Sequence, residues 1–140
     1  MKSGAISILG CGWLGVPLAR HLLENGFTVK GSVTSAEKFD LLQNIGIQPY
    51  RIVLNGKLAE VDDSTFFDCD VLIISIPPRR IADIERVFPA QIAGLISLIL
   101  ESEIQKIIFI SSTSVYPENL QTASESDELF PDKSSGKALI

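Results

Sequence analysis

The sequence has few of the residues on which disulfide-rich and metal-binding domains depend. Among its 140 residues there are two cysteines and one histidine. Cys11 and Cys69 lie far apart and form no CxxC pair, so they predict neither a disulfide framework nor a zinc site. We therefore expect no metal.

Basic residues are also scarce. Lys and Arg number 12 against 17 Asp and Glu, which gives a formal net charge of −5. A surface that binds duplex nucleic acid needs a basic stripe to displace counterions, and this sequence has none. We expect a small-molecule substrate and no nucleic acid as partner.

Long hydrophobic runs are missing as well. The run Ile92–Leu100 is interrupted by Gly94 and Ser97 and is far shorter than the roughly 20 residues of a membrane span. Near the N-terminus, the apolar run Ala5–Leu9 is too short for the core of a signal peptide. These absences predict a cytoplasmic protein with no membrane partner.

The residues that are abundant indicate an ordered domain. Hydrophobic residues make up 46% of the chain and charged residues 21%, with a mean hydropathy of +0.28. Such a chain buries enough apolar surface to fold, and it favours strands that are covered on both faces. Its length suits one domain over residues 1–140.

Apolar strand-like runs alternate with helical patterns along the chain. Because parallel strands need crossover helices, this order predicts the α/β class, a Rossmann-type doubly wound parallel sheet. Residues 117–136 are expected to form a polar loop, and residues 137–140 the first turn of another helix. Since the chain stops in that turn, we expect a domain truncated before a C-terminal part. The predicted strands are Ala5–Leu9, Phe27–Thr34, Tyr50–Leu54, Val71–Ile76 and Lys106–Ser111, and the predicted helices run from about Gly12 to Asn25, from Ser35 to Ile45 and from Pro89 to about Glu103.

A glycine-rich GxGxxG motif follows the first predicted strand and opens the first predicted helix. In a βαβ unit this context predicts a dinucleotide-binding loop, in which the helix N-terminus faces the phosphates. We expect the Cys11 side chain to fill space in the loop and the Trp13 side chain to pack across it, and we expect a structural role for His21. The candidate cofactor-binding residues of the loop are Gly10, Cys11, Gly12, Trp13, Leu14 and Gly15.

The end of the second strand lacks the acid that usually binds the ribose of NAD. Thr34 and Ser35 occupy that place, and no carboxylate appears before Glu37. This favours NADP over NAD, with Thr34 and Ser35 as donors and Lys38 or Lys30 as added charge. The missing acid also counts against an S-adenosylmethionine enzyme.

Three segments together resemble the extended short-chain dehydrogenase/reductase superfamily, in particular its NAD-dependent epimerase/dehydratase-like members. They are residues 8–19, residues 76–80 and the stretch Ile108–Tyr116, which reads IFISSTSVY. The resemblance implies an NAD(P)-binding half, a C-terminal part that shapes the substrate pocket, and a homodimer. Within residues 76–80, Ile76, Pro77 and Pro78 are then candidate cofactor contacts.

The resemblance also implies a catalytic set of Ser or Thr, Tyr and Lys. Ser112 with its neighbour Thr113 matches the serine, and Lys137 matches the lysine. The tyrosine of the YxxxK motif is missing, because Lys133 stands four residues before Lys137. Without that tyrosine, ordinary carbonyl reduction lacks its proton donor, so the chemistry differs, another residue substitutes, or the protein binds cofactor without turnover.

Two arginines follow the fourth predicted strand at the edge where ligands sit in such sheets. Arg79 and Arg80 are candidates for binding phosphates or an anionic substrate, or they form a solvated loop pair. The sequence thus favours an NAD(P)-binding oxidoreductase or epimerase-like protein acting on a nucleotide-linked or small carbonyl substrate. A non-catalytic NAD(P)-binding or redox-sensing module is the alternative, and a cofactor-independent scaffold a weaker one.

Overall fold

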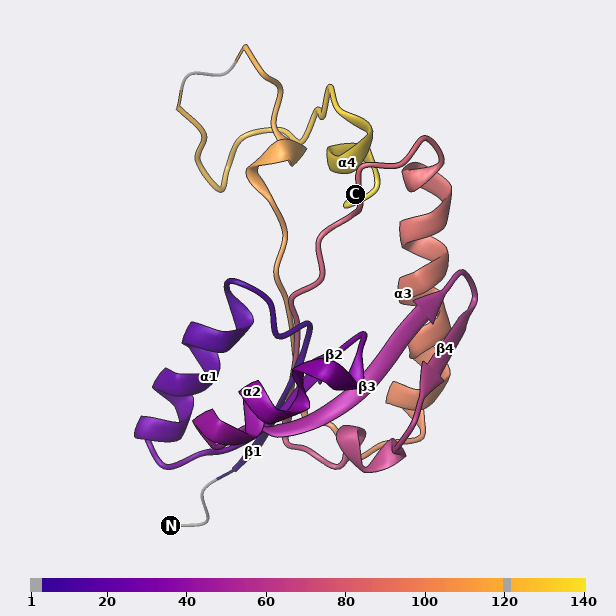
Figure 1. Cartoon of the computed structure of the whole chain (residues 1–140). Helices are drawn as coiled ribbons and strands as arrows, with labels where there is room; N and C mark the ends of the chain where they lie inside the picture. Colours follow the sequence, from indigo (N-terminus) through magenta and orange to yellow (C-terminus); the bar gives the residue numbers. More distant parts are fainter. Residues whose placement is uncertain (1–3, 120–121) are drawn as a thin grey trace.

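The computed structural model describes residues 4–119 and 122–140 and is built on a six-stranded sheet (Figure 1). The strand order is β4-β3-β2-β1-β5-β6, and every neighbouring pair is parallel except β3 and β4. The strands are β1 (Ala5–Leu9), β2 (Thr28–Val33), β3 (Gln48–Asn55), β4 (Leu58–Val61), β5 (Val71–Ile74) and β6 (Lys106–Phe109).

Helices connect the parallel strands. The α-helices are α1 (Gly15–Glu24), α2 (Phe39–Ile45), α3 (Ile84–Leu100) and α4 (Ser134–Lys137). Single 3₁₀ turns lie at η1 (Ala36–Lys38), η2 (Ser64–Phe67) and η3 (Thr113–Val115).

The order of the parallel strands confirms the predicted doubly wound sheet. The chain moves outward from β1 through β2 to β3, and then returns to place β5 on the other side of β1. The direction of winding reverses between β1 and β5, and crevices that bind ligands form at the carboxyl ends of strands at such a point. In Figure 1 the segment that contains η3 and α4 lies beyond this edge.

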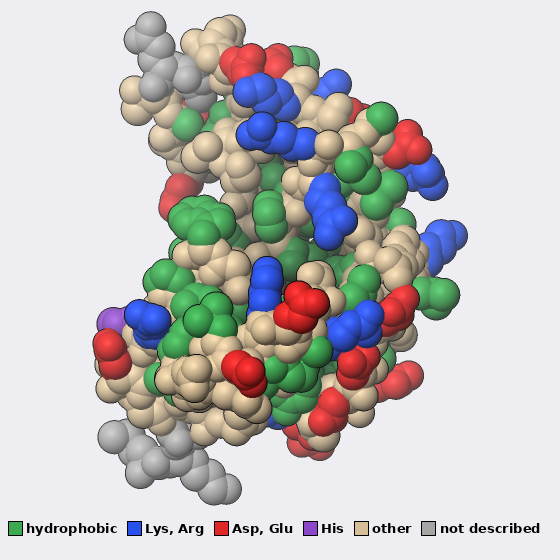
Figure 2. All heavy atoms as spheres, in the orientation of Figure 1, with side chains coloured by type: hydrophobic (Ala, Val, Ile, Leu, Met, Phe, Trp, Pro, Cys, Tyr) green, Lys and Arg blue, Asp and Glu red, His purple; other side chains and the backbone are tan. Residues whose placement is uncertain are grey.

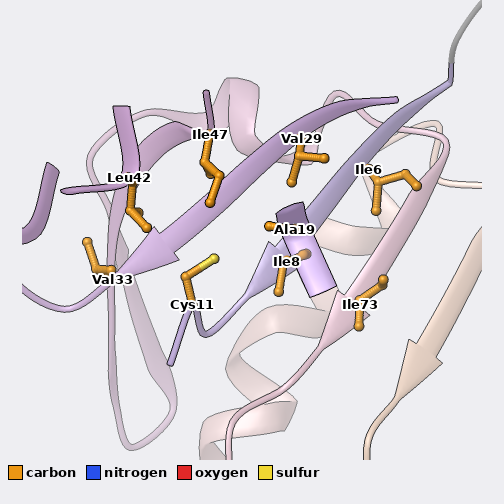
Figure 3. Packing of buried hydrophobic residues seen from close by; sticks show 9 residues of the cluster. All are labelled: Ile6, Ile8, Cys11, Ala19, Val29, Val33, Leu42, Ile47 and Ile73. Atoms are coloured by element: carbon orange, nitrogen blue, oxygen red, sulfur yellow. The ribbon is translucent and has the colours of Figure 1, made fainter. Parts of the chain in front are cut away.

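Alternating side chains divide the core into two layers. Ile8 in β1 packs with Ala19 of α1 and Leu42 of α2, in the cluster drawn in Figure 3. The next residue, Leu9, points to the opposite face and packs with Leu95 of α3. The strands at the centre are therefore buried on both faces, as the composition predicted.

The edge strand β6 departs from that expectation. All four of its residues are exposed, and Ile107 keeps 48% of its accessible surface. β6 pairs with β5 on one side, and the ring of its Phe109 meets that of Phe88 of α3 edge to face at 6.5 Å. Composition is an average over the chain, so it could not show which strand would lie at an edge.

The long helix begins earlier than predicted. We expected Pro89 in its first turn, but α3 begins at Ile84 and carries Pro89 in its sixth position. Pro89 is exposed, and so is Glu85, the residue whose carbonyl lacks an amide partner there. Within residues 4–119 and 122–140, no helix combines the length and apolar character needed to cross a membrane.

The β3–β4 hairpin was missed from the sequence. Its two-residue turn is Gly56-Lys57, and Gly56 has a φ of 57°, the positive φ that tight hairpin turns need at their first central residue. Across the hairpin Arg51 forms ion pairs with Asp62 at 3.0 Å and Glu60 at 3.5 Å. The Gln91 side chain donates to the carbonyl of Leu54 at 2.9 Å and so joins the hairpin to α3.

Lys30 does not lie where the sequence placed it. It was expected to add charge beside the cofactor ribose, but it is only 8% exposed on the α3 side of the sheet. Its ammonium group donates to the carbonyl oxygens of Thr65 and Asp68, in and just after η2. Lys30 is therefore a structural lysine that holds η2 against the sheet.

This position predicts a stability effect that is separate from ligand binding. Lys30→Met keeps the length of the side chain but removes the donor, and we expect it to lower the free energy of unfolding by about 1–3 kcal/mol. Lys57→Met, at an exposed lysine of the hairpin, is the control and should change it little. Denaturant unfolding measures both. If Lys30→Met left the stability unchanged and weakened NADPH binding, Lys30 would instead be a contact of the cofactor phosphate.

Candidate functional site

The glycine-rich loop joins β1 to α1 at the carboxyl edge of the sheet. Gly10 has a φ of 100°, and a Cβ there would lie 2.7 Å from the carbonyl oxygen of Ser75. A Cβ on Gly15 would lie 2.4 Å from the carbonyl oxygen of Gly10. Both positions therefore require glycine. The backbone at the start of α1 packs directly against the backbone at the end of β1.

Hydrogen bonds from β2 fix the start of this loop. The amide of Gly10 donates to the Ser32 hydroxyl at 2.9 Å, and the amide of Cys11 donates to the Ser32 carbonyl at 2.8 Å. Gly12 differs from its neighbours, because a Cβ built on it meets nothing within 4 Å. The loop is thus packed at both ends and open in the middle.

The two side chains expected to pack within the loop behave differently. Cys11 is buried in the α1–α2 core layer, which confirms it as a filler. Burial raises the pKa of its thiol from 9.0 to about 11, against a smaller lowering by its hydrogen bond with the Ser32 backbone. Trp13 is 87% exposed, so the prediction that it packs across the loop is wrong. His21 is exposed on α1, away from the loop.

A first hollow, here called the β2 hollow, lies beside the loop and has a volume of about 320 Å³. Its walls come from the ends of β1, β2, β3 and β5 and from α3. Thr34, Lys38 and Arg79 line it, and no Asp or Glu is among its described lining residues. Ser35 and Arg80 do not line it. The Ser35 hydroxyl instead accepts from the amide of Glu37 at 3.4 Å and caps η1.

A second hollow, here called the loop hollow, lies on the other side of the glycine-rich loop and has a volume of about 190 Å³. It shares Ile76 and Pro77 with the β2 hollow. Its remaining lining residues are Trp13, Leu14, Ser75, Pro78, Ile110, Ser111, Ser112 and Leu139.

A third hollow, here called the η3 hollow, has a volume of about 430 Å³ and shares Ser112 with the loop hollow. The three hollows therefore follow one another along the carboxyl edge. Figure 2 shows this side of the molecule hollowed between the sheet and the segment beyond it, with Lys and Arg side chains around the depression.

The η3 hollow brings together residues that are distant in sequence. Ser112 and Thr113, which follow β6, line it with Lys133, which precedes α4. The two segments touch at Gly136, where a Cβ would collide with the carbonyl oxygen of Ser114. Lys137 is exposed and does not line any of the three hollows.

Lys133 is held in place by an acidic partner. Its ammonium group forms an ion pair with Glu118, and the backbone amide of Glu118 donates to Asp132 at 2.6 Å. Sequence reasoning noted Lys133 only as the residue in the place of a tyrosine. Its position four residues before Lys137 was the signal that could have placed it beside Ser112.

The strand order, the winding reversal and the glycine-rich loop define a Rossmann-type α/β fold. No family model matches the chain. The chain is 34% identical over 136 residues to protein YeeZ of Escherichia coli strain K12. The match covers 96% of this chain and 50% of YeeZ, so the chain spans about half the length of that relative.

Solved structures support the same fold. A UDP-glucuronic acid 4-epimerase from Bacillus cereus, in complex with NAD, aligns with a TM-score of 0.72 and 22% identity over 96% of this chain and 48% of its own. Vestitone reductase from alfalfa aligns with a TM-score of 0.60 and 19% identity, over 80% of this chain and 37% of its own. These two neighbours are an epimerase and a reductase, and at identities of 22% and 19% they show the fold alone.

The raised pKa of Cys11 predicts an unusual pH profile for alkylation. In a Cys69→Ala variant, Cys11 is the single thiol, and only its thiolate reacts. Because the folded pKa is about 11, the rate of iodoacetamide alkylation should still rise about tenfold per pH unit between about pH 9 and pH 10. A rate that levels off near pH 9, with circular dichroism showing a folded chain, contradicts the assignment.

Proposed function

We propose that this chain is the NAD(P)-binding domain of an oxidoreductase or epimerase-like enzyme of the extended short-chain dehydrogenase/reductase type. The observation that carries the proposal is the row of three hollows along the carboxyl edge, with the glycine-rich loop between the first two. A dinucleotide consists of two nucleosides joined by a diphosphate, and the β2 hollow, the glycine-rich loop and the loop hollow offer places for these three parts in the same order. The diphosphate would lie over Gly12, where the backbone is open.

In this proposal the adenosine half occupies the β2 hollow and carries a 2′-phosphate. Lys38 and Arg79 supply two positive charges there, and no carboxylate among the described lining residues repels a phosphate. Thr34 adds a hydroxyl donor. The chain is therefore proposed to prefer NADP over NAD.

The η3 hollow is proposed as the place of the substrate carbonyl. A bound nicotinamide would supply or accept the hydride. The hydroxyl groups of Ser112 and Thr113 would hold the substrate oxygen, and a proton would be exchanged at that oxygen. Lys133 lines the same hollow and takes the proton-donating role that the missing tyrosine leaves open, whereas Lys137 lies outside the three hollows and has no part in this proposal.

Reduction of a carbonyl group consumes one hydride and one proton. In reduction, the Lys133 ammonium would give its proton to the carbonyl oxygen as the carbonyl carbon receives the hydride that a bound nicotinamide would supply. The neutral amine of Lys133 would then regain a proton from solvent and pair again with Glu118.

Gly12→Val should weaken cofactor binding without harming the fold. The added side chain meets no protein atom within 4 Å at its Cβ, yet it fills the space proposed for the diphosphate. We expect NADPH affinity to fall by at least about tenfold while the melting temperature stays unchanged. Calorimetric titration with NADPH measures the affinity, and Gly12→Ala should give an intermediate value. Undiminished binding in Gly12→Val would place the cofactor elsewhere.

The neighbouring arginines form a matched pair for testing cofactor preference. Both are exposed, but only Arg79 lines the β2 hollow. Arg79→Ala should weaken NADPH binding by about fivefold to tenfold and leave NADH binding unchanged, while Arg80→Ala should change neither. Thr34→Asp should shift preference toward NADH, because its carboxylate repels the 2′-phosphate. Equal effects of the two arginine variants would remove the argument for a phosphate in this hollow.

A further inference from the structure

Trp13 is the most exposed large hydrophobic side chain of the described residues. It keeps 87% of its accessible surface, while the loop that carries it is fixed by close backbone contacts at Gly10 and Gly15. An exposed indole on an otherwise tightly packed loop has no role in the core. Single exposed apolar side chains are common on protein surfaces, but Trp13 differs from the others in bordering a hollow beside the glycine-rich loop, which makes it a candidate ligand contact.

The position of Trp13 limits what that ligand can be. The indole lies at the border of the loop hollow, whose lining is mostly apolar and includes Pro77, Pro78 and Leu139. The polar lining residues of this hollow are Ser111 and Ser112, which follow β6, and Ser75, which follows β5. The hollow therefore offers an aromatic face, apolar walls and a polar end, which together suit a flat heteroaromatic ring with a polar substituent.

We propose that the indole of Trp13 closes over the nicotinamide ring of the bound cofactor in the loop hollow. This inference rests on the proposed function, which places the phosphorylated adenosine in the β2 hollow and the diphosphate over Gly12. The second nucleoside must then lie on the other side of the loop, beneath Trp13. Stacking of the indole on the ring orients the ring, and the hydroxyl of Ser112 lies at the entrance to the η3 hollow.

The same arrangement shields the reacting carbon from water. The loop hollow shares Ser112 with the η3 hollow, so a ring held under Trp13 faces the place proposed for the substrate carbonyl. Trp13 thus acts as a positioning residue. Its contribution should be confined to ligands that carry the nicotinamide, because the adenosine half lies in the other hollow.

Two ligands separate these halves of the cofactor. NADPH carries the nicotinamide, while 2′-phospho-ADP-ribose has the same adenosine and diphosphate without it. We expect Trp13→Ala to weaken NADPH binding by about tenfold and to leave 2′-phospho-ADP-ribose within about twofold, both measured by calorimetry. Trp13→Phe should retain most of the NADPH affinity. Phe130→Ala, at a 70% exposed aromatic outside all three hollows, is the control and should change neither value.

Fluorescence gives an independent readout because Trp13 is the single tryptophan of the chain. NADPH should protect its emission from acrylamide quenching, and 2′-phospho-ADP-ribose should not. Equal weakening of both ligands in Trp13→Ala, or no weakening of either, overturns the role of Trp13 and leaves the cofactor site standing. If neither ligand binds the parent chain, the proposed function itself fails.

Discussion

The backbone of Gly15 lies so close to the carbonyl oxygen of Gly10 that a Cβ between them would be 2.4 Å from that oxygen. Gly10 is pressed in the same way against the backbone of Ser75, which follows β5. These contacts bring the end of β1, the start of α1 and the end of β5 to one point. The arrangement leaves Gly12 open between two hollows, and every part of the proposed site is placed relative to it.

A second backbone contact completes the edge. Gly136 touches the carbonyl of Ser114, and this contact fixes the segment around α4 against η3. Lys133 and Ser112 are thereby placed on one hollow although 20 residues of sequence separate them. Burial of Ala138 against Ile84 and Phe88 of α3 holds the same segment from its other side. The proximity of Lys133 and Ser112 at this edge therefore depends on tertiary packing.

The sequence predicted what depends on local pattern. The alternation of apolar strands and helices, and a glycine-rich loop directly after the first strand, sufficed for the doubly wound sheet and the place of the loop. It did not predict that the Lys30 side chain is buried against one face of the sheet. The carbonyl groups that accept hydrogen bonds from its ammonium group lie in and just after η2, a segment distant in sequence. The exposure of Trp13 and of β6 was missed for a related reason, since periodicity does not show which neighbours a side chain will have. The β3–β4 hairpin, by contrast, carried a glycine turn signal at Gly56 that local reasoning could have used.

The central claim is that the carboxyl edge binds a dinucleotide in one direction. A crystal structure of this chain with NADPH tests it directly, because the three hollows are distinct and lie in a fixed order. The account predicts the phosphorylated adenosine beside Lys38 and Arg79, the diphosphate over Gly12, and the nicotinamide beneath Trp13 and beside Ser112. NADPH bound in the reverse direction, or at any other surface, would contradict it.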